Sequence, residues 1–278
     1  MLPLILSTLS TLSPDVQEIQ IERLFHSPST EEASSELLMR CNPYHLRKYN
    51  VDSPISAAAL RHIIQLPSLE KFWLVVDTFR LLDPLPVVLL PAIKNPVLTS
   101  IFVECSAADV AQLMEAFQLT AATCGIQERL QEFRVRSQEE FKISPEVITC
   151  TLPFKNLMSL QVLSECSTVI CQTFDLTDDH INLLTKAMPR LESLAIGEEP
   201  CRVPSQITFK SLYTISNWCT WLANLQIHFN PASFVTRVDS DSETGSVALG
   251  LSDLTTPAVD LSLGARGHLP SDYIVVTL

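Results

Sequence analysis

Glycine is scarce in this chain, which holds only 6 glycines against 18 prolines in 278 residues. A protein built from antiparallel hairpins usually needs more glycine, because tight hairpin turns require backbone conformations that glycine adopts most easily. Proline suits regularly repeated helix ends instead, because the residue before a proline is pushed out of the helical conformation. The composition therefore disfavours a hairpin-rich β sandwich.

Positive charge is in the minority as well, with 19 lysines and arginines against 31 aspartates and glutamates and a net charge of −12. A nucleic-acid-binding protein needs a basic surface that displaces counterions from phosphates. Short basic clusters occur at Arg47 and Lys48 and at Arg134 and Arg136, but they form no long stripe. We therefore expect no nucleic-acid partner.

Features of membrane and secreted proteins are also missing. No run reaches the roughly 18 apolar residues of a membrane span, and no Asn-x-Ser/Thr acceptor occurs. The eight cysteines are scattered and include no CxxC pair, so we expect buried, reduced thiols and a cytoplasmic or nuclear location. The apolar segment 1–13 lacks the basic start and small-residue cleavage site of a signal peptide. We interpret it as the last helix of a repeat whose beginning is missing, and we expect no membrane partner.

One short pattern recurs along the chain: an apolar residue, two variable residues, a second apolar residue, one variable residue and an apolar β-former. Eight copies are present, namely Val16/Ile19/Ile21, Leu46/Tyr49/Val51, Leu69/Phe72/Leu74, Leu98/Ile101/Val103, Leu130/Phe133/Val135, Leu157/Leu160/Val162, Leu191/Leu194/Ile196 and Leu222/Leu225/Ile227. Successive copies are separated by about 29 positions on average, at the long end of the leucine-rich-repeat period. A single unit cannot bury its apolar residues, so the copies are expected to stack on one another.

The segments between the copies are typical of helices. Ser106 precedes a helical pattern over 107–123 and Gly125 follows it, which are the positions of an N-cap and a C-terminal glycine. Thr177 precedes a second pattern over 178–187. Strands that repeat with one helix between them pair in parallel, with the helices outside. The sequence therefore predicts an α/β leucine-rich-repeat solenoid, with parallel strands on the concave side and helices on the convex side.

The expected array of about eight degenerate repeats covers residues 1–235. Residues 236–278 begin with an acidic linker and contain an alternating stretch, Val259–Leu263. This end of the chain is either an unstructured tail or a degenerate ninth repeat, and the sequence leaves both possibilities open.

These repeats resemble the leucine-rich repeats of fungal F-box proteins, and the eighth unit, residues 207–229, matches their style most closely. The resemblance covers residues 1 to about 235. The asparagine or cysteine expected eight residues after the first repeat leucine occurs only once, at Asn230. In that family the F-box contacts the ligase adaptor and the repeats hold the substrate. No F-box-like segment precedes the repeats here, so the resemblance implies substrate recognition, with adaptor binding only if an F-box lies upstream in a longer product.

No residue set predicts catalysis, a cofactor or a metal. Asp178, Asp179 and His180 open a helical pattern, where carboxylates complement the helix dipole. The cysteine and histidine spacings form no four-ligand zinc set, and no phosphate-binding or nucleophile motif occurs. We therefore expect a protein-binding module and no enzyme. The alternatives are a repeat scaffold or adaptor unconnected with ubiquitination and, more remotely, a cysteine hydrolase.

The strand period of two residues predicts which side chains face a partner on the concave side. Trp73 and Phe102 fall there on adjacent strands, with Arg134 and Arg136 on the next strand. Aromatic residues and arginine are enriched where binding energy concentrates at interfaces. We predict that these four residues form the protein-binding site, the alternative being that Trp73 and Phe102 pack beneath the apolar segment 81–90.

Overall fold

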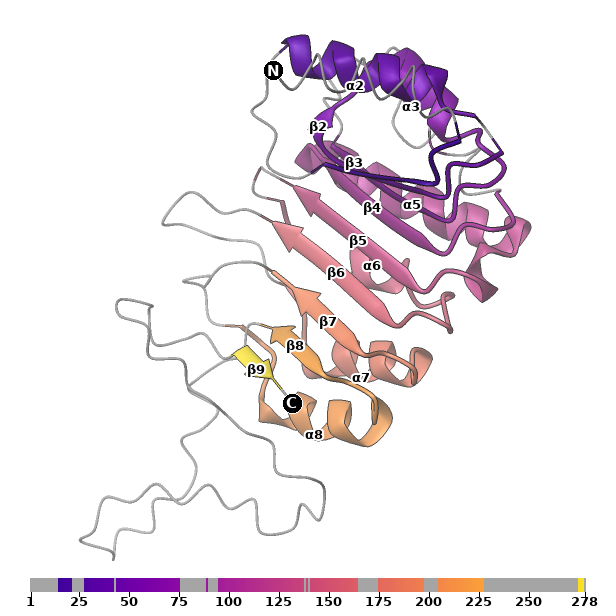
Figure 1. Ribbon diagram of the computed structural model, residues 1–278. Helices are drawn as coiled ribbons and strands as arrows, with labels where there is room; N and C mark the ends of the chain where they lie inside the picture. Colours follow the sequence, from indigo (N-terminus) through magenta and orange to yellow (C-terminus); the bar gives the residue numbers. More distant parts are fainter. Residues whose placement is uncertain are drawn as a thin grey trace, which may run out of the picture.

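The computed structural model describes residues 15–21, 28–42, 44–75, 89, 95–137, 139, 141–164, 175–197, 205–227 and 275–277. A single sheet of nine strands runs through them in chain order (Figure 1). The strands are β1 (Glu18–Ile21), β2 (Lys48–Pro54), β3 (Lys71–Val75), β4 (Ser100–Cys105), β5 (Glu132–Ser137), β6 (Ser159–Ser164), β7 (Ser193–Ile196), β8 (Asn224–Ile227) and β9 (Val275–Thr277). The helices are α2 (Pro28–Arg40), α3 (Ala57–Ile63), α5 (Ala107–Cys124), α6 (Pro145–Thr149), α7 (Asp178–Ala187) and α8 (Phe209–Trp218), with a short 3₁₀ helix η2 (Ile126–Glu128).

The eight predicted triplets form the first eight strands, and every pairing between them is parallel. The central apolar residues of the triplets are direct partners across the sheet, in the order Ile19, Tyr49, Phe72, Ile101, Phe133, Leu160, Leu194 and Leu225. The expected parallel stacking is thus confirmed: the chain has an α/β fold with one all-parallel eight-strand sheet alternating with helices.

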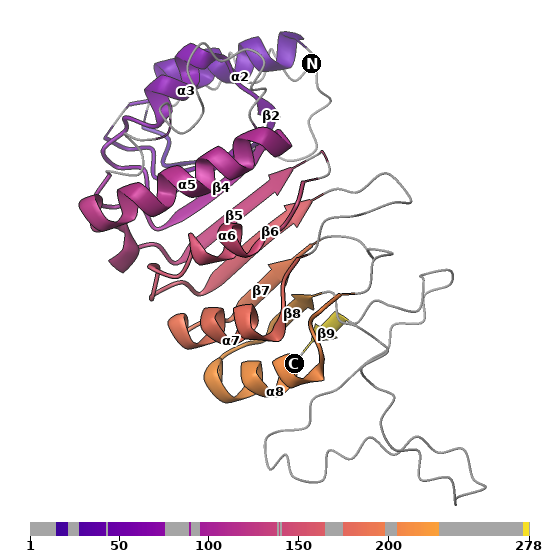
Figure 2. The same cartoon turned by 180° about the vertical axis from the view of Figure 1, so that it is seen from behind.

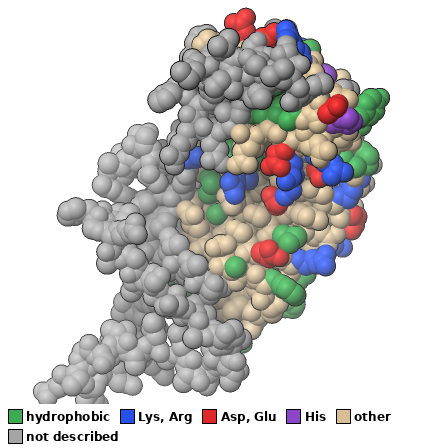
Figure 3. Space-filling model, in the orientation of Figure 1, with side chains coloured by type: hydrophobic (Ala, Val, Ile, Leu, Met, Phe, Trp, Pro, Cys, Tyr) green, Lys and Arg blue, Asp and Glu red, His purple; other side chains and the backbone are tan. Residues whose placement is uncertain are grey.

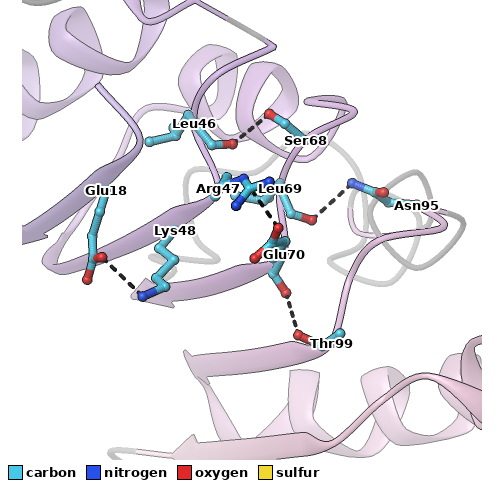
Figure 4. Close-up of polar contacts among 9 residues, drawn as sticks. All are labelled: Glu18, Leu46, Arg47, Lys48, Ser68, Leu69, Glu70, Asn95 and Thr99. Atoms are coloured by element: carbon cyan, nitrogen blue, oxygen red, sulfur yellow. Dashed lines mark hydrogen bonds and ion pairs between the residues drawn. The ribbon is translucent and has the colours of Figure 1, made fainter. Parts of the chain in front are cut away.

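A repeated hydrogen-bond arrangement fixes the start of each strand. The amides of Arg47 and Lys48 both donate to the carbonyl of Gln17, at 2.8 and 3.1 Å, and the same two-to-one bonding recurs at the next six strands. Side chains add to it in the upper part of the sheet, where Thr99 Oγ1 donates to the Glu70 carbonyl at 3.2 Å (Figure 4). Equivalent positions of successive units are therefore held at the same depth, which keeps the strands in register.

The predicted capping residues lie where they were expected around α5. The Ser106 hydroxyl accepts a hydrogen bond from the amide of Asp109 at 3.4 Å. Gly125 follows the helix with a φ of 65°, a left-handed conformation that an L-residue adopts only with strain. The helix α6 begins at Pro145 and spans only five residues.

The core lies between the sheet and the helices, which Figure 2 shows in front of the strands. Leu38, Leu60, Leu113 and Leu184 of the helices are buried in it together with the central triplet residues. The aromatic rings of Phe117 on α5 and Phe133 on β5 pack with their centroids 4.9 Å apart. The parallel part of the sheet thus buries one face against the helices.

The described cysteines Cys41, Cys105, Cys150 and Cys219 are buried and unpaired. Burial raises the pKa of the Cys41 and Cys219 thiols to about 11 and that of Cys105 to about 12. These thiols therefore stay protonated near neutral pH and pack as small apolar side chains. Among the described helices, none combines the length and apolar character that crossing a bilayer requires.

The ninth strand departs from the pattern, because β9 pairs antiparallel with β8. Its position beside β8 covers backbone groups at the edge of the sheet. The alternating stretch 259–263 lies outside the described residues, so the choice between a tail and a degenerate ninth repeat is not tested.

Candidate interface on the sheet

Side chains of the strands alternate between the core and the opposite face of the sheet, here called the front face. In β5 and β6 each half-buried residue is followed by a buried one. Strand pairing arranges the front-face residues in rows. The aromatic row consists of Asn50, Trp73, Phe102 and Arg134, and the charged row consists of Glu18, Lys48, Lys71, Ser100 and Glu132. Figure 3 shows this side of the molecule, with acidic and basic side chains next to one another.

A hollow of about 280 Å³, here called the front hollow, lies over these two rows and extends from β1 to β6. Its lining includes Trp73 and Phe102 from the aromatic row, and both lysines of the charged row. The described part of the front face therefore has a hollow lined by three of the four residues that the sequence indicated, and partner binding there stays a prediction.

Three of the four predicted interface residues meet in this hollow. The rings of Trp73 and Phe102 are tilted by 55° with centroids 4.2 Å apart, and the Arg134 guanidinium carbon lies 5.1 Å from the Phe102 centroid. Aromatic pairs and cation–π contacts of this kind each contribute about 0.5–1.5 kcal/mol. The three side chains thus form one stacked group, Trp73–Phe102–Arg134.

The exposure of the stacked group is uneven. Trp73 is half-buried, but Phe102 is only 7% exposed, and all six residues of its strand β4 are buried. The Phe102 ring therefore supports Trp73 and Arg134 and offers little surface of its own. The alternative packing beneath segment 81–90 concerns residues outside the described ones, apart from Leu89, which is buried in the main core.

Arg136, the fourth predicted residue, lies apart from the stacked group. It pairs across the sheet with Glu104, two residues along from the aromatic row, and it does not line the front hollow. The sequence placed Arg134 and Arg136 on the same face, and the strand period of two explains this. In the register of β4 and β5, Arg134 lies opposite Phe102 and Arg136 lies opposite Glu104, so the two arginines have different neighbours.

The charged row is internally paired. Lys48 Nζ lies 3.1 Å from Glu18 Oε2, and Lys71 Nζ lies 2.6 Å from Glu132 Oε1. The second pair reaches from β3 to β5 across Ser100, whose hydroxyl donates to Glu132 Oε2 at 3.0 Å. Only a small residue between the two strands leaves room for this bridge. The sequence holds the opposite charges at equivalent positions, but it does not show which of them meet.

Polar atoms of the aromatic row lack partners. The Trp73 indole Nε1 and the Asn50 Oδ1 are buried without a hydrogen bond in the described part of the chain. The Arg134 guanidinium also forms neither a hydrogen bond nor an ion pair there. Burial lowers the pKa of Arg134, while nearby Glu132 raises it and Arg136 lowers it. Buried polar groups without a partner are unusual in native proteins, so each of them calls for an explanation.

A second hollow, of about 440 Å³, lies at the turns that precede the strands and is lined by Arg129, Asn156 and Arg190. Polar side chains of this second hollow form hydrogen bonds with the backbone of the turns. Arg129 donates to the Asn95 carbonyl at 3.1 Å, and Asn156 Nδ2 donates to the Glu128 carbonyl at 2.8 Å. These contacts join successive turns, so this hollow is a less suitable ligand site than the front hollow.

The cluster around Asp178 joins two helices. The Asp178 carboxylate accepts hydrogen bonds from Thr208 N at 2.7 Å, Thr208 Oγ1 at 2.6 Å and Ser211 Oγ at 2.5 Å, all at the start of α8. His180 Nδ1 accepts from the amide of Thr177 at 3.1 Å, which closes the capping of α7. As predicted, these residues open a helix, and the link to α8 is what the sequence did not show. Within the described residues no group of three or more histidines, cysteines or carboxylates is placed to hold a metal ion.

We expect Asp178→Asn to lower the free energy of unfolding by about 1–2 kcal/mol at pH 7, because charge-assisted hydrogen bonds are lost. Burial by itself would raise the pKa of Asp178, but the hydrogen bonds from Ser211 and Thr208 outweigh it, so the pKa lies below its ordinary value. Because the pKa of Asp178 is lower in the folded chain than in the unfolded chain, its ionised carboxylate stabilises the fold. This stabilisation is complete above the unfolded pKa, near 3.9, and is lost as the pH falls through the folded pKa. The gap between variant and wild type should therefore shrink below about pH 4.

Urea unfolding at pH 7 and at lower pH measures this gap. The control is Asp179→Asn, which removes the same charge from an exposed position in the same helical turn. An equal effect of the two variants, or a gap that stays constant with pH, would contradict the assigned role of Asp178.

No protein-family model matches this sequence, and no curated protein matches it either. The functional conclusion therefore depends on the geometry of the chain itself.

Proposed function

We propose that this chain is a leucine-rich-repeat solenoid that binds another protein on its front face, in the manner of the substrate-recognition part of an F-box ubiquitin-ligase receptor. Eight parallel strands at a spacing of about 29 residues, alternating with helices, support the repeat class. Parallel stacking of this kind creates extended surfaces that repeat proteins use for binding.

The single observation that carries a binding role is the front hollow with its stacked group. Trp73 and Arg134 are residue types in which binding energy concentrates, and they meet in this hollow over the supporting Phe102 ring. The hollow contains ion-paired carboxylates and an arginine, and its described lining residues include no cysteine or histidine. Such a lining suits recognition rather than bond cleavage, so we propose a binding module without catalytic activity. Buried, reduced cysteines support a cytoplasmic or nuclear location.

The test is affinity purification of the full chain from cells, in parallel with two variants. Trp73→Ala removes an aromatic ring from the front hollow, whereas Arg190→Gln changes an exposed residue at the turn edge of the sheet. We expect a set of proteins that co-purify with the wild type and with Arg190→Gln but not with Trp73→Ala. Identical sets from all three chains would contradict binding on the front face.

A second purification, with a longer product that carries an F-box, separates the receptor from a scaffold. A receptor role predicts that subunits of the ubiquitin machinery occur among the proteins bound by a product that carries an F-box. Front-face partners without any such subunit would instead favour a repeat scaffold or adaptor unconnected with ubiquitination.

A further inference from the structure

The charges that line the front hollow do not cancel. Its lining contains the cations Lys48, Lys71 and Arg134 and the carboxylates Glu18 and Glu132. Each carboxylate is ion-paired with one lysine. Among the described residues of the hollow, Arg134 is thus the cation whose charge is not matched by a direct partner.

Arg134 is also held in a defined position. Its guanidinium lies over the buried Phe102 ring, and partial burial removes water from it. A guanidinium offers a planar fork of N–H donors that matches a carboxylate with two parallel hydrogen bonds. The neighbouring Trp73 adds an indole N–H that lacks an acceptor in the described chain. Both groups are donors, so the hollow calls for an acceptor that carries negative charge.

We propose that the front hollow recognises one aspartate or glutamate side chain of an extended segment of the partner protein, with the carboxylate bonded to Arg134. This proposal deepens the proposed function and rests on it. A single carboxylate balances the one cation that is unmatched among the described residues of the hollow. A phosphate, with a charge near −2, would face the Glu132 and Glu18 carboxylates with only this one described cation to offset it. The hollow therefore favours an acidic side chain over a phosphorylated one.

The unpaired Asn50 oxygen extends the site along the row. It lies one strand before Trp73 and is buried without a donor in the described part of the chain. A backbone N–H of an extended peptide meets this acceptor while an acidic side chain reaches Arg134, three strands further on. The row thus fits a segment that crosses the strands, with its acidic residue at the Arg134 end.

A random nine-residue peptide library displayed on phage provides the test, with the full 278-residue chain as the bait. We expect the selected peptides to share an aspartate or glutamate at one fixed position. Their affinity for Arg134→Gln should fall about 10- to 100-fold, the loss expected for a charged, two-bond contact. Arg190→Gln, which removes the same charge from the turn edge, should bind them as tightly as the wild type.

A second measurement needs no variant of the protein. One selected peptide is synthesised with glutamate, glutamine or phosphoserine at the fixed position, and each form is titrated into the wild-type chain. Glutamate binding at least about tenfold more tightly than both others supports the proposal. Equal binding of glutamine, or tighter binding of phosphoserine, overturns it.

The outcomes also separate this proposal from the proposed function. Selected peptides that depend on Trp73 but show no acidic preference would leave front-face binding standing and overturn carboxylate recognition. Failure of the wild-type chain to select any peptide would count against both.

Discussion

Leu194→Asp should unfold the region around β7 and lower the free energy of unfolding by more than about 4 kcal/mol. Leu194 is 1% exposed, and its strand partners Leu160 and Leu225 are buried beside it. Removing a buried leucine costs about 2–5 kcal/mol, and burying an unpaired carboxylate adds several more. A domain is stable by only about 5–15 kcal/mol, so the variant is expected at the limit of folding.

Circular dichroism and urea unfolding measure the loss, and hydrogen exchange locates it. Repeat proteins bury each unit mainly against its neighbours, so exchange should accelerate first in β6, β7 and β8 and later in β2 to β4. Ser193→Asp is the control, because it places the same charge on the preceding, half-buried front-face residue. If the two variants unfold at the same urea concentration, the inward orientation of Leu194 is wrong.

Trp73→Ala should weaken binding of a front-face partner by more than about 2 kcal/mol, roughly 30-fold. The ring lines the front hollow and contacts Phe102, so its loss removes apolar contact area and leaves the Phe102 ring, on which Arg134 stacks, without its aromatic partner. The free energy of unfolding should fall by only about 1 kcal/mol, because Trp73 is half-buried and loses mainly one aromatic contact.

Isothermal titration with a selected peptide and urea unfolding should be carried out on the same preparation. Trp221→Ala is the matched control, since Trp221 is 71% exposed in the turn before β8 and does not line the front hollow. We expect it to change neither quantity by more than about 0.5 kcal/mol. Unchanged affinity for Trp73→Ala together with a large loss of stability would show that Trp73 is a core residue. The proposed role of Trp73 in binding at the front hollow would then be wrong.

Several features of the fold could be predicted because they depend on local spacing. An apolar residue at every second strand position must face the core, so the triplets identified all eight parallel strands. Ser106 and Gly125 marked the ends of α5 for a similarly local reason, since a cap satisfies backbone groups within one turn. The same period placed Trp73, Phe102 and Arg134 on one face.

Other features depend on which residues meet across units, and spacing carries no information about that. Arg134 and Arg136 looked equivalent in the sequence, but strand register puts one beside Phe102 and the other beside Glu104. The Asp178 carboxylate binds the start of α8 rather than serving α7 alone, because the two helices pack side by side. Likewise, the pairing of β9 with β8 joins segments separated by 47 residues.

The sequence by itself determined the repeat period, the strands and the faces of their side chains, since each follows from the backbone geometry of a few consecutive residues. Only the tertiary structure decided that Lys71 and Glu132 neutralise each other across Ser100, while Arg134 has no ion-pair partner among the described residues. Ion pairing depends on distances between side chains of different strands, which the register and the size of the intervening residue set.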